Sequence, residues 1–463
     1  MSDIIGNPSS QSFRRRAILR QALGARLSFV GVLVVLRIAL DASYIFFVTP
    51  IFDYAGLSLQ IDPVKVTESY IFFIILSLIV PCKLNKPSDF LVLLLFLFPI
   101  FATLSFYGLN DQNRNFTYMI IASFLLFITV RNAPRVKVTS LQGGRIIAVI
   151  LAATFVTTAL IIMAANGGFK QMTFQLGNEL YQFREATSEQ VRPGFVAYLF
   201  TWVFKLFNMA LLVWGLYRRK FLVVVVVLAL QVLFFATSHA KAVLFFPVII
   251  FGIYFSFRNR LRMHIIIFGL IGVISASLLV SYLTDSILLP SLFIRRIFYL
   301  PVQMNYAYYE FFSQNGLVYM SNSVLSFLNE YPYSYNPPNL IGDFIYGTPK
   351  TNANTGFLAT GYMHFGFVGM LLFSAITGFL VRMVDSLVVD RLPNWVGLAI
   401  IIVPFWSLFL SSDLSTAMLT HGIIPGFVML WLFGSYHRSI RQLLLRLRMG
   451  SQISTESSGS PVT

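Results

Sequence analysis

Two adjacent arginines, Arg295 and Arg296, precede a run of tyrosines in the longest polar interruption of an otherwise apolar sequence, residues 284–354. A guanidinium group can bind phosphate through two parallel hydrogen bonds, and a tyrosine offers a flat ring and a hydroxyl to a sugar. The tyrosines nearest to the arginine pair are Tyr299, Tyr306, Tyr308 and Tyr309. The segment could therefore bind a phosphorylated glycan. Because basic aromatic segments also lie in the lipid interface, packing against the membrane surface is the alternative.

Two further cations, Arg192 and Lys241, lie beside predicted helix ends on the same side of the membrane. Arg192 is followed by Pro193 and Gly194 at the entry to a helix, where it can contact an anion or extend from the helix end into the interface. Lys241 follows Ser238-His239-Ala240 and directly precedes an apolar run. Because Lys241 opposes the charge bias described below, we expect it to have a function.

Polar residues near the helix that follows the interruption could bind or activate a substrate. Asn352 and Asn354 stand at its N-terminal end, where side-chain caps and free backbone N–H groups can receive an anion. Glu310, Asp343 and Asp413 are the carboxylates that lie in or beside the segments richest in other candidates. The segments expected on this side of the membrane contain no cluster of carboxylates or histidines with metal-ligand spacing. We therefore expect chemistry without a bound metal, with arginine and lysine supplying positive charge.

The elements that must position these residues are membrane-spanning helices. The 463 residues are 57% hydrophobic and 11% charged, whereas soluble domains are about 25% charged. The net charge of +16 is spread as short clusters between apolar segments, which favours membrane topology over a nucleic-acid-binding face. The single cysteine, Cys82, excludes an intrachain disulfide. Segments long enough to span the bilayer lie near residues 27–48, 67–82, 90–107, 116–130, 145–164, 194–216, 221–237, 242–257, 263–283, 355–381, 394–411 and 414–434.

We therefore predict an all-α polytopic membrane protein with about 12 transmembrane helices. Lysine and arginine collect in the segments on the side of the two termini, which indicates that both termini are cytoplasmic. The short pair of spans around residues 238–241 could instead be one bent or re-entrant element. The predicted organisation is a cytoplasmic tail at 1–26, a single transmembrane domain at 27–434 with outer loops at 166–193 and at 284–354, between the ninth and tenth helices, and a cytoplasmic tail at 435–463.

Three motifs carry a resemblance to a known family. They are Ser238-His239-Ala240-Lys241, then Arg295-Arg296-Ile-Phe-Tyr-Leu-Pro, then Asn352-Ala-Asn-Thr-Gly with Phe365-Gly-Phe-Val-Gly further on. The chain resembles the Wzy-type O-antigen polymerases, also described as oligosaccharide repeat unit polymerases. The resemblance lies in the order of these motifs, in the side of the membrane on which they are expected, and in the large outer loop of the C-terminal half. The resemblance implies a multi-pass protein of the bacterial inner membrane whose large loop faces the periplasm.

The resemblance also implies a reaction between two undecaprenyl-diphosphate-linked glycans at the periplasmic face. A hydroxyl of the incoming repeat unit attacks the reducing-end anomeric carbon of the growing chain, and undecaprenyl diphosphate leaves. Fixed cations would stabilise the departing diphosphate, and those expected to do so are Arg192, Lys241, Arg295 and Arg296. A carboxylate or histidine would accept the proton, and the candidates are Glu310, Asp343 and His239. The residues expected to bind sugars are Tyr299, Tyr306, Tyr309, Asn352 and Asn354.

No cofactor is expected, because the diphosphate linkage supplies the energy and the sequence has no G-x-x-x-x-G-K-[ST] loop. The expected partners are the lipid-linked oligosaccharide, the bilayer and a co-polymerase that regulates chain length, and no nucleic acid is expected.

Two other functions remain open. An O-antigen ligase would use the same donor and share the outline of spans and a large periplasmic loop. A flippase or ion-coupled transporter would use charged residues inside the membrane. Arg37, Asp41 and Lys205 lie within predicted spans, where they could line a cavity or pair with one another.

Overall fold

The computed structural model describes residues 8–167, 169, 172, 174, 194–258, 263–323 and 326–435. The first elements are α1 (Pro8–Ser43), η1 (Tyr44–Val48), α2 (Thr49–Phe52), η2 (Asp53–Ala55), α3 (Pro63–Ile79), α4 (Pro87–Leu95), η3 (Phe96–Ile100), α5 (Phe101–Leu109), α6 (Arg114–Arg131) and α7 (Gly144–Ala165). The middle elements are α9 (Phe195–Trp202), η5 (Val203–Phe207), α10 (Asn208–Tyr217), α11 (Phe221–Ser238), α12 (Ala242–Arg258), α13 (Met263–Thr284), α14 (Leu288–Pro290), η6 (Ser291–Tyr299), α15 (Leu300–Asn315) and α16 (Pro337–Tyr346). The last are α17 (Phe357–Val388), α18 (Asn394–Leu410), α19 (Leu414–Leu419) and α20 (Ile423–Phe433). The described residues contain no strand, which confirms the all-α class.

Eight helices of the described part are long and apolar enough to cross a membrane, which confirms the multi-pass character that the composition predicts. The helices α12 and α18 are apolar but shorter, and α3 and α6 occupy the two remaining predicted spans. The wide helical turns η1, η3 and η5 each continue an α-helix within one of the long spans. In η3 the cause is local, because Pro99 has no N–H to donate to the preceding turn.

The connection between α11 and α12 is a tight turn. His239 adopts a left-handed backbone with a φ of 54° and ends α11, and α12 begins at Ala242. A left-handed residue after a helix stops the helical hydrogen-bond pattern. Residues 238–241 therefore connect two distinct helices.

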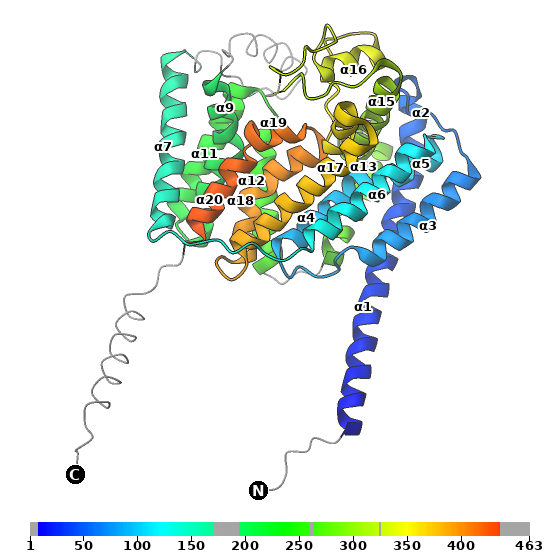
Figure 1. Cartoon of the computed structure of the whole chain (residues 1–463), viewed down its shortest axis with the longest axis horizontal. Coiled ribbons are helices and arrows are strands. Elements are labelled where there is room, and N and C mark those ends of the chain that lie inside the picture. Colours follow the sequence, from blue (N-terminus) through cyan, green and yellow to red (C-terminus); the bar gives the residue numbers. More distant parts are fainter. Residues whose placement is uncertain are drawn as a thin grey trace, which may run out of the picture.

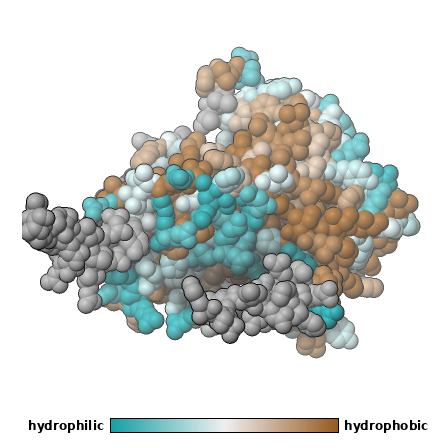
Figure 2. Space-filling view, turned by 60° about the horizontal axis from the view of Figure 1, so that its bottom comes forward, coloured by the Kyte–Doolittle hydropathy of each residue, from teal (hydrophilic) through white to brown (hydrophobic). Residues whose placement is uncertain are grey.

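The two ends of the helix bundle differ in character. Helix α16 lies at one end, which we call the loop end, whereas α1 begins and α20 ends at the opposite, terminal end (Figure 1). Figure 2 turns the terminal end toward the viewer and shows hydrophilic residues gathered there, beside a broad apolar surface. A polar end and an apolar flank are what a helix bundle that crosses a bilayer must present.

The segment 284–354 differs from the expected polar outer loop, because much of it is helical and packed into the bundle. It contains α14, η6, α15 and α16, and α15 contacts α17 and α5. The stretch from Val302 to Tyr308 is buried. The physical reason is the high density of aromatic residues. Each aromatic ring carries a large apolar area, and burying this area in the bundle stabilises the fold.

A buried polar cluster ties this segment to the first helices. The Nε–H of Arg37 donates to Asp41 Oδ2 at 2.8 Å. Asp41 also accepts hydrogen bonds from the hydroxyls of Tyr70, at 2.8 Å, and Ser105, at 2.5 Å. The Tyr299 hydroxyl on η6 lies 3.1 Å from Ser105 Oγ. The charges of Arg37 and Asp41 therefore pair with each other inside the bundle, as buried charges must.

Candidate functional site

A pocket of about 420 Å³ lies at the loop end, between η6, α15, α16, residues 351–354 and the end of α18. This volume falls within the range of roughly 300–1,000 Å³ that is typical of small-ligand sites. Its polar lining residues are Arg296, Tyr346, Thr351, Asn352, Asn354 and Ser411. Its apolar lining residues are Ile297, Leu300, Pro301, Met304, Ala353, Trp406 and Leu410. We call this cavity the amphiphilic pocket, and it brings together Arg296, Asn352 and Asn354, which the sequence had singled out separately.

The segment before α17 presents its two asparagines to the amphiphilic pocket. Along this extended stretch Asn352 and Asn354 are exposed, whereas Ala353 and Thr355 are buried. Side chains alternate between the two sides of an extended chain, so the two amides lie on one side. The backbone N–H of Ala353 donates to the carbonyl of Pro338 at 2.9 Å, which holds the stretch against α16.

Glycine makes this contact with α16 possible. A Cβ at position 342 would lie 1.9 Å from the carbonyl oxygen of Thr351, so only glycine allows the two backbones to approach. Gly342 therefore sets the distance between α16 and the asparagine wall.

The two arginines of η6 have different surroundings. Arg296 is exposed and lines the amphiphilic pocket. The Cζ of Arg295 lies 4.3 Å from the ring centre of Phe52, and its buried Nε–H has no acceptor among the described residues. Neither arginine forms an ion pair with a residue that the structure describes. Two positive charges without a described carboxylate partner favour an anionic ligand.

Tyr346 adds a hydroxyl that the sequence pattern did not indicate. Burial raises the pKa of Tyr346, although the positive charge of Arg295 opposes this rise. The phenol is therefore a neutral hydrogen-bond donor at neutral pH. Helix α16 ends directly after it, because Gly347 adopts a left-handed backbone with a φ of 65°. The Tyr346-Gly347 pair at the helix end was the sequence signal that could have identified Tyr346. No local sequence pattern pointed to Thr351, Trp406 or Ser411.

The three tyrosines expected to bind sugars lie in the helix packing. Tyr299 is fully buried. Tyr306 is also buried, and its hydroxyl lies 2.7 Å from Thr117 Oγ1. The half-buried ring of Tyr309 stacks on Phe116 with 4.7 Å between the ring centres. All three rings pack against neighbouring aromatic side chains, and none of them lines the amphiphilic pocket.

The three expected proton acceptors lie outside the lining of the amphiphilic pocket. Glu310 is exposed on α15, Asp343 is half-buried on α16 and His239 is buried at the end of α11. Asp343 precedes Tyr346 by less than one helical turn, so it shares an element with the pocket wall. The lining itself includes no carboxylate and no histidine.

The remaining expected cations are Lys241 and Arg192. Lys241 directly precedes α12, and α12 packs against α18, which supplies Trp406 and Leu410 to the amphiphilic pocket. Lys241 itself does not line the pocket. Arg192 lies outside the described residues.

Asp413 and His364 form a structural pair near the end of α18. His364 is fully buried, and its Nε2 lies 3.1 Å from Asp413 Oδ2. The Nδ1 of His364 accepts the backbone N–H of Met320 at 3.1 Å, so Nε2 carries the proton that is donated to Asp413. Asp413 also accepts the backbone N–H of Ser415 at 2.8 Å and begins α19. The pair joins three segments and has no open bonding position on His364.

The amphiphilic pocket can thus bind a molecule with an anionic group, polar hydroxyls and an apolar portion. In the part of the chain that the structure describes, no group of three or more histidine, cysteine, aspartate or glutamate side chains could hold a metal ion. Comparisons with protein-family models, curated proteins and solved structures gave no match.

Proposed function

We propose that this protein is a membrane glycosyltransferase that polymerises lipid-linked oligosaccharide repeat units. It transfers the growing glycan from undecaprenyl diphosphate to a hydroxyl of the incoming undecaprenyl-diphosphate-linked repeat. The observation that carries the proposal is the amphiphilic pocket, in which Arg296, Asn352 and Asn354 face an apolar wall.

The donor matches the lining of the pocket group by group. Its diphosphate suits the guanidinium of Arg296, with the Tyr346 hydroxyl as a second donor. The amides of Asn352 and Asn354 can both donate and accept, as the hydroxyls of a sugar require. The first isoprene units suit the apolar residues Leu300 and Trp406.

The positive charge acts on the departing group. As the acceptor hydroxyl attacks the anomeric carbon, the bond from this carbon to the phosphate oxygen breaks, and the diphosphate leaves with the electron pair. Arg296 stabilises the developing charge, and the neighbouring Arg295, whose charge also acts on Tyr346, adds to the positive potential. The proton of the attacking hydroxyl passes to a group beyond the pocket lining, for which Asp343, Glu310 and His239 remain the candidates.

The proposal includes a membrane orientation. The chain has twelve spans in the bacterial inner membrane, with both termini in the cytoplasm and the loop end in the periplasm. The bias of lysine and arginine along the sequence supports this orientation.

Purified protein decides between an enzyme and a carrier. We expect the protein in detergent, supplied with undecaprenyl-diphosphate-linked repeat units, to form chains of two or more repeats and release undecaprenyl diphosphate. Protein that moves the lipid across a liposome membrane but extends nothing would contradict the proposal.

An O-antigen ligase is the second candidate, because its donor would fit the same pocket. A deletion strain separates the two. Loss of a polymerase leaves lipid A-core that carries a single repeat unit, whereas loss of a ligase leaves core without any repeat.

A further inference from the structure

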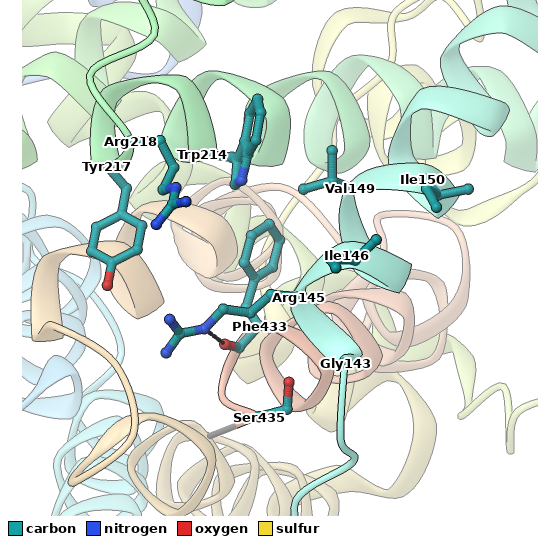
Figure 3. Close-up of a pocket in the computed structure, with 10 residues that line it drawn as sticks. All are labelled: Gly143, Arg145, Ile146, Val149, Ile150, Trp214, Tyr217, Arg218, Phe433 and Ser435. Carbon is teal, nitrogen blue, oxygen red and sulfur yellow. Dashed lines mark hydrogen bonds between the residues drawn. The ribbon is translucent and has the colours of Figure 1, made fainter. Parts of the chain in front are cut away.

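A second cavity, of about 330 Å³, lies at the terminal end of the bundle, where α7 begins and α10 and α20 end. We call it the basal pocket. It is remote from the amphiphilic pocket, which lies at the loop end, and the proposed reaction uses none of its residues. In Figure 3 the guanidinium groups of Arg145 and Arg218 lie on the same side as the Tyr217 ring, whereas Ile146 and Ile150 lie on the other side.

Arg145 is held in place by the end of α20. Its Nε–H donates to the carbonyl of Phe433 at 2.9 Å, the bond drawn in Figure 3. Next to it, a Cβ on Gly144 would lie 2.7 Å from the carbonyl of Leu432, so glycine lets α7 and α20 approach closely. The terminal nitrogens of Arg145 make no hydrogen bond to a described residue, so they can bind a ligand.

The charge in the basal pocket lacks a counter-charge in the described structure. The lining contains no carboxylate. Neither Arg145 nor Arg218 forms an ion pair with any residue that the structure describes. Two guanidinium groups beside one cavity attract an anion, and phosphate matches their planar donor geometry.

The side of the basal pocket opposite the two arginines is apolar. Ile146 and Ile150 are 66% and 59% exposed on α7, a helix long and apolar enough to span the membrane. Trp214 and Tyr217 line the pocket near the end of α10. Tryptophan and tyrosine at helix ends are typical of the depth at which lipid headgroups lie.

We propose that the basal pocket binds an anionic glycerophospholipid. The phosphate lies between Arg145 and Arg218, and one acyl chain follows Ile146 and Ile150. A free phosphate ion would leave this apolar wall in water, and a zwitterionic lipid would bring a cation toward two arginines. The basal pocket therefore favours an anionic lipid over free phosphate and over a zwitterionic lipid.

The test compares lipids retained by the full-length protein. Protein reconstituted with equal amounts of phosphatidylethanolamine and phosphatidylglycerol is extracted gently, and bound lipids are identified by native mass spectrometry. We expect the wild type to retain phosphatidylglycerol preferentially, and R145Q/R218Q to reduce the preference roughly tenfold or more. Glutamine can keep the hydrogen bond to Phe433, so this substitution spares the contact with α20. The matched control is K220Q, which removes a neighbouring exposed charge outside the lining.

Thermal unfolding provides a second measurement. Phosphatidylglycerol should raise the Tm of the wild type and K220Q and leave that of R145Q/R218Q unchanged. If the double variant does not fold, R218Q alone, at an exposed position, should show a smaller loss of preference. Equal retention of the two lipids by the wild type, or an undiminished preference in folded R145Q/R218Q or R218Q, would overturn the proposal. Displacement of the lipid by millimolar inorganic phosphate would also overturn it, because the site would then be one for phosphate alone.

Discussion

The hydroxyl of Thr355 donates to the side-chain oxygen of Asn305 at 2.5 Å, and both residues are buried. Asn305 belongs to α15, whose residues Leu300 and Met304 line one side of the amphiphilic pocket. Thr355 follows Asn354, which lines another side. One buried hydrogen bond therefore connects two walls of the candidate site.

Replacing Thr355 by valine should destabilise the protein by about 1–3 kcal/mol, because Asn305 Oδ1 would be left buried without its donor. The asparagine wall should also loosen, so binding of the lipid-linked substrate should weaken. Thermal unfolding and substrate binding measure the two effects.

The matched control for this change is T129V. Thr129 is exposed, and its hydroxyl bonds only to the carbonyl of Leu125 in its own helix. Its loss should change stability by no more than about 0.5 kcal/mol. Equal destabilisation by the two variants would show that the bond to Asn305 has no special weight.

Replacing Arg296 by alanine should reduce the rate of chain extension roughly a hundredfold or more, because the departing diphosphate loses a charged donor. The initial rate with purified protein and the length of polymer in cells are the measurements. K350A is the control, because Lys350 is an exposed cation of the same segment that does not line the amphiphilic pocket. Wild-type polymer in a strain that carries R296A would remove Arg296 from the mechanism.

Replacing Tyr346 by phenylalanine should lower the extension rate on the order of tenfold, because one hydrogen bond to a charged oxygen is lost. The raised pKa of Tyr346 determines the pH dependence. Because this pKa lies above its ordinary value of about 10, the hydroxyl stays protonated as the pH rises from 7 to 9. The ratio of wild-type to Y346F rates should therefore be constant over this range. A ratio that falls with rising pH would mean that the phenol ionises earlier than its surroundings allow.

Replacing Asp413 by asparagine should lower the Tm at pH 7. Burial alone would raise the pKa of Asp413, but hydrogen bonds from His364 and Ser415 outweigh it and hold this pKa below its ordinary value. A carboxylate whose pKa is lowered by folding stabilises the protein above its unfolded pKa of about 3.9, and this stabilisation is lost as the pH falls through the folded pKa. The Tm difference between wild type and D413N should therefore shrink as the pH falls below about 4.

The control for D413N is D285N, at an exposed turn residue. It should leave the Tm nearly unchanged at pH 7. A D413N effect that stays the same from pH 7 down to pH 3 would assign the loss to packing and not to the carboxylate charge.

The helices were largely predictable from local sequence. The apolar runs at 90–107 and 145–164 became the spans Pro87–Leu109 and Gly144–Ala165. Hydrocarbon requires an unbroken run of apolar residues whatever the neighbouring helices are, so length and composition suffice to locate such spans. Boundaries also followed local rules, as where Asp62 accepts the N–H of Val64 and begins α3.

Contacts between distant parts of the chain decided which aromatic and polar residues of segment 284–354 are buried and which line the pocket. Tyr299 and Asn352 both looked like sugar contacts, yet one is buried beside Ser105 and the other lines the amphiphilic pocket. A local pattern indicates that a residue is amphipathic but does not indicate which helix will cover it.

By itself, the sequence determined an all-α membrane protein and the residue types from which a site could be made. Only the tertiary structure decided that Arg296, Tyr346 and Asn354 share one pocket with Trp406. The physical reason is that apolarity along the chain determines where helices form, whereas a pocket depends on how side chains from several helices pack. Close contacts such as Gly342 against Thr351 are set only when the whole bundle assembles.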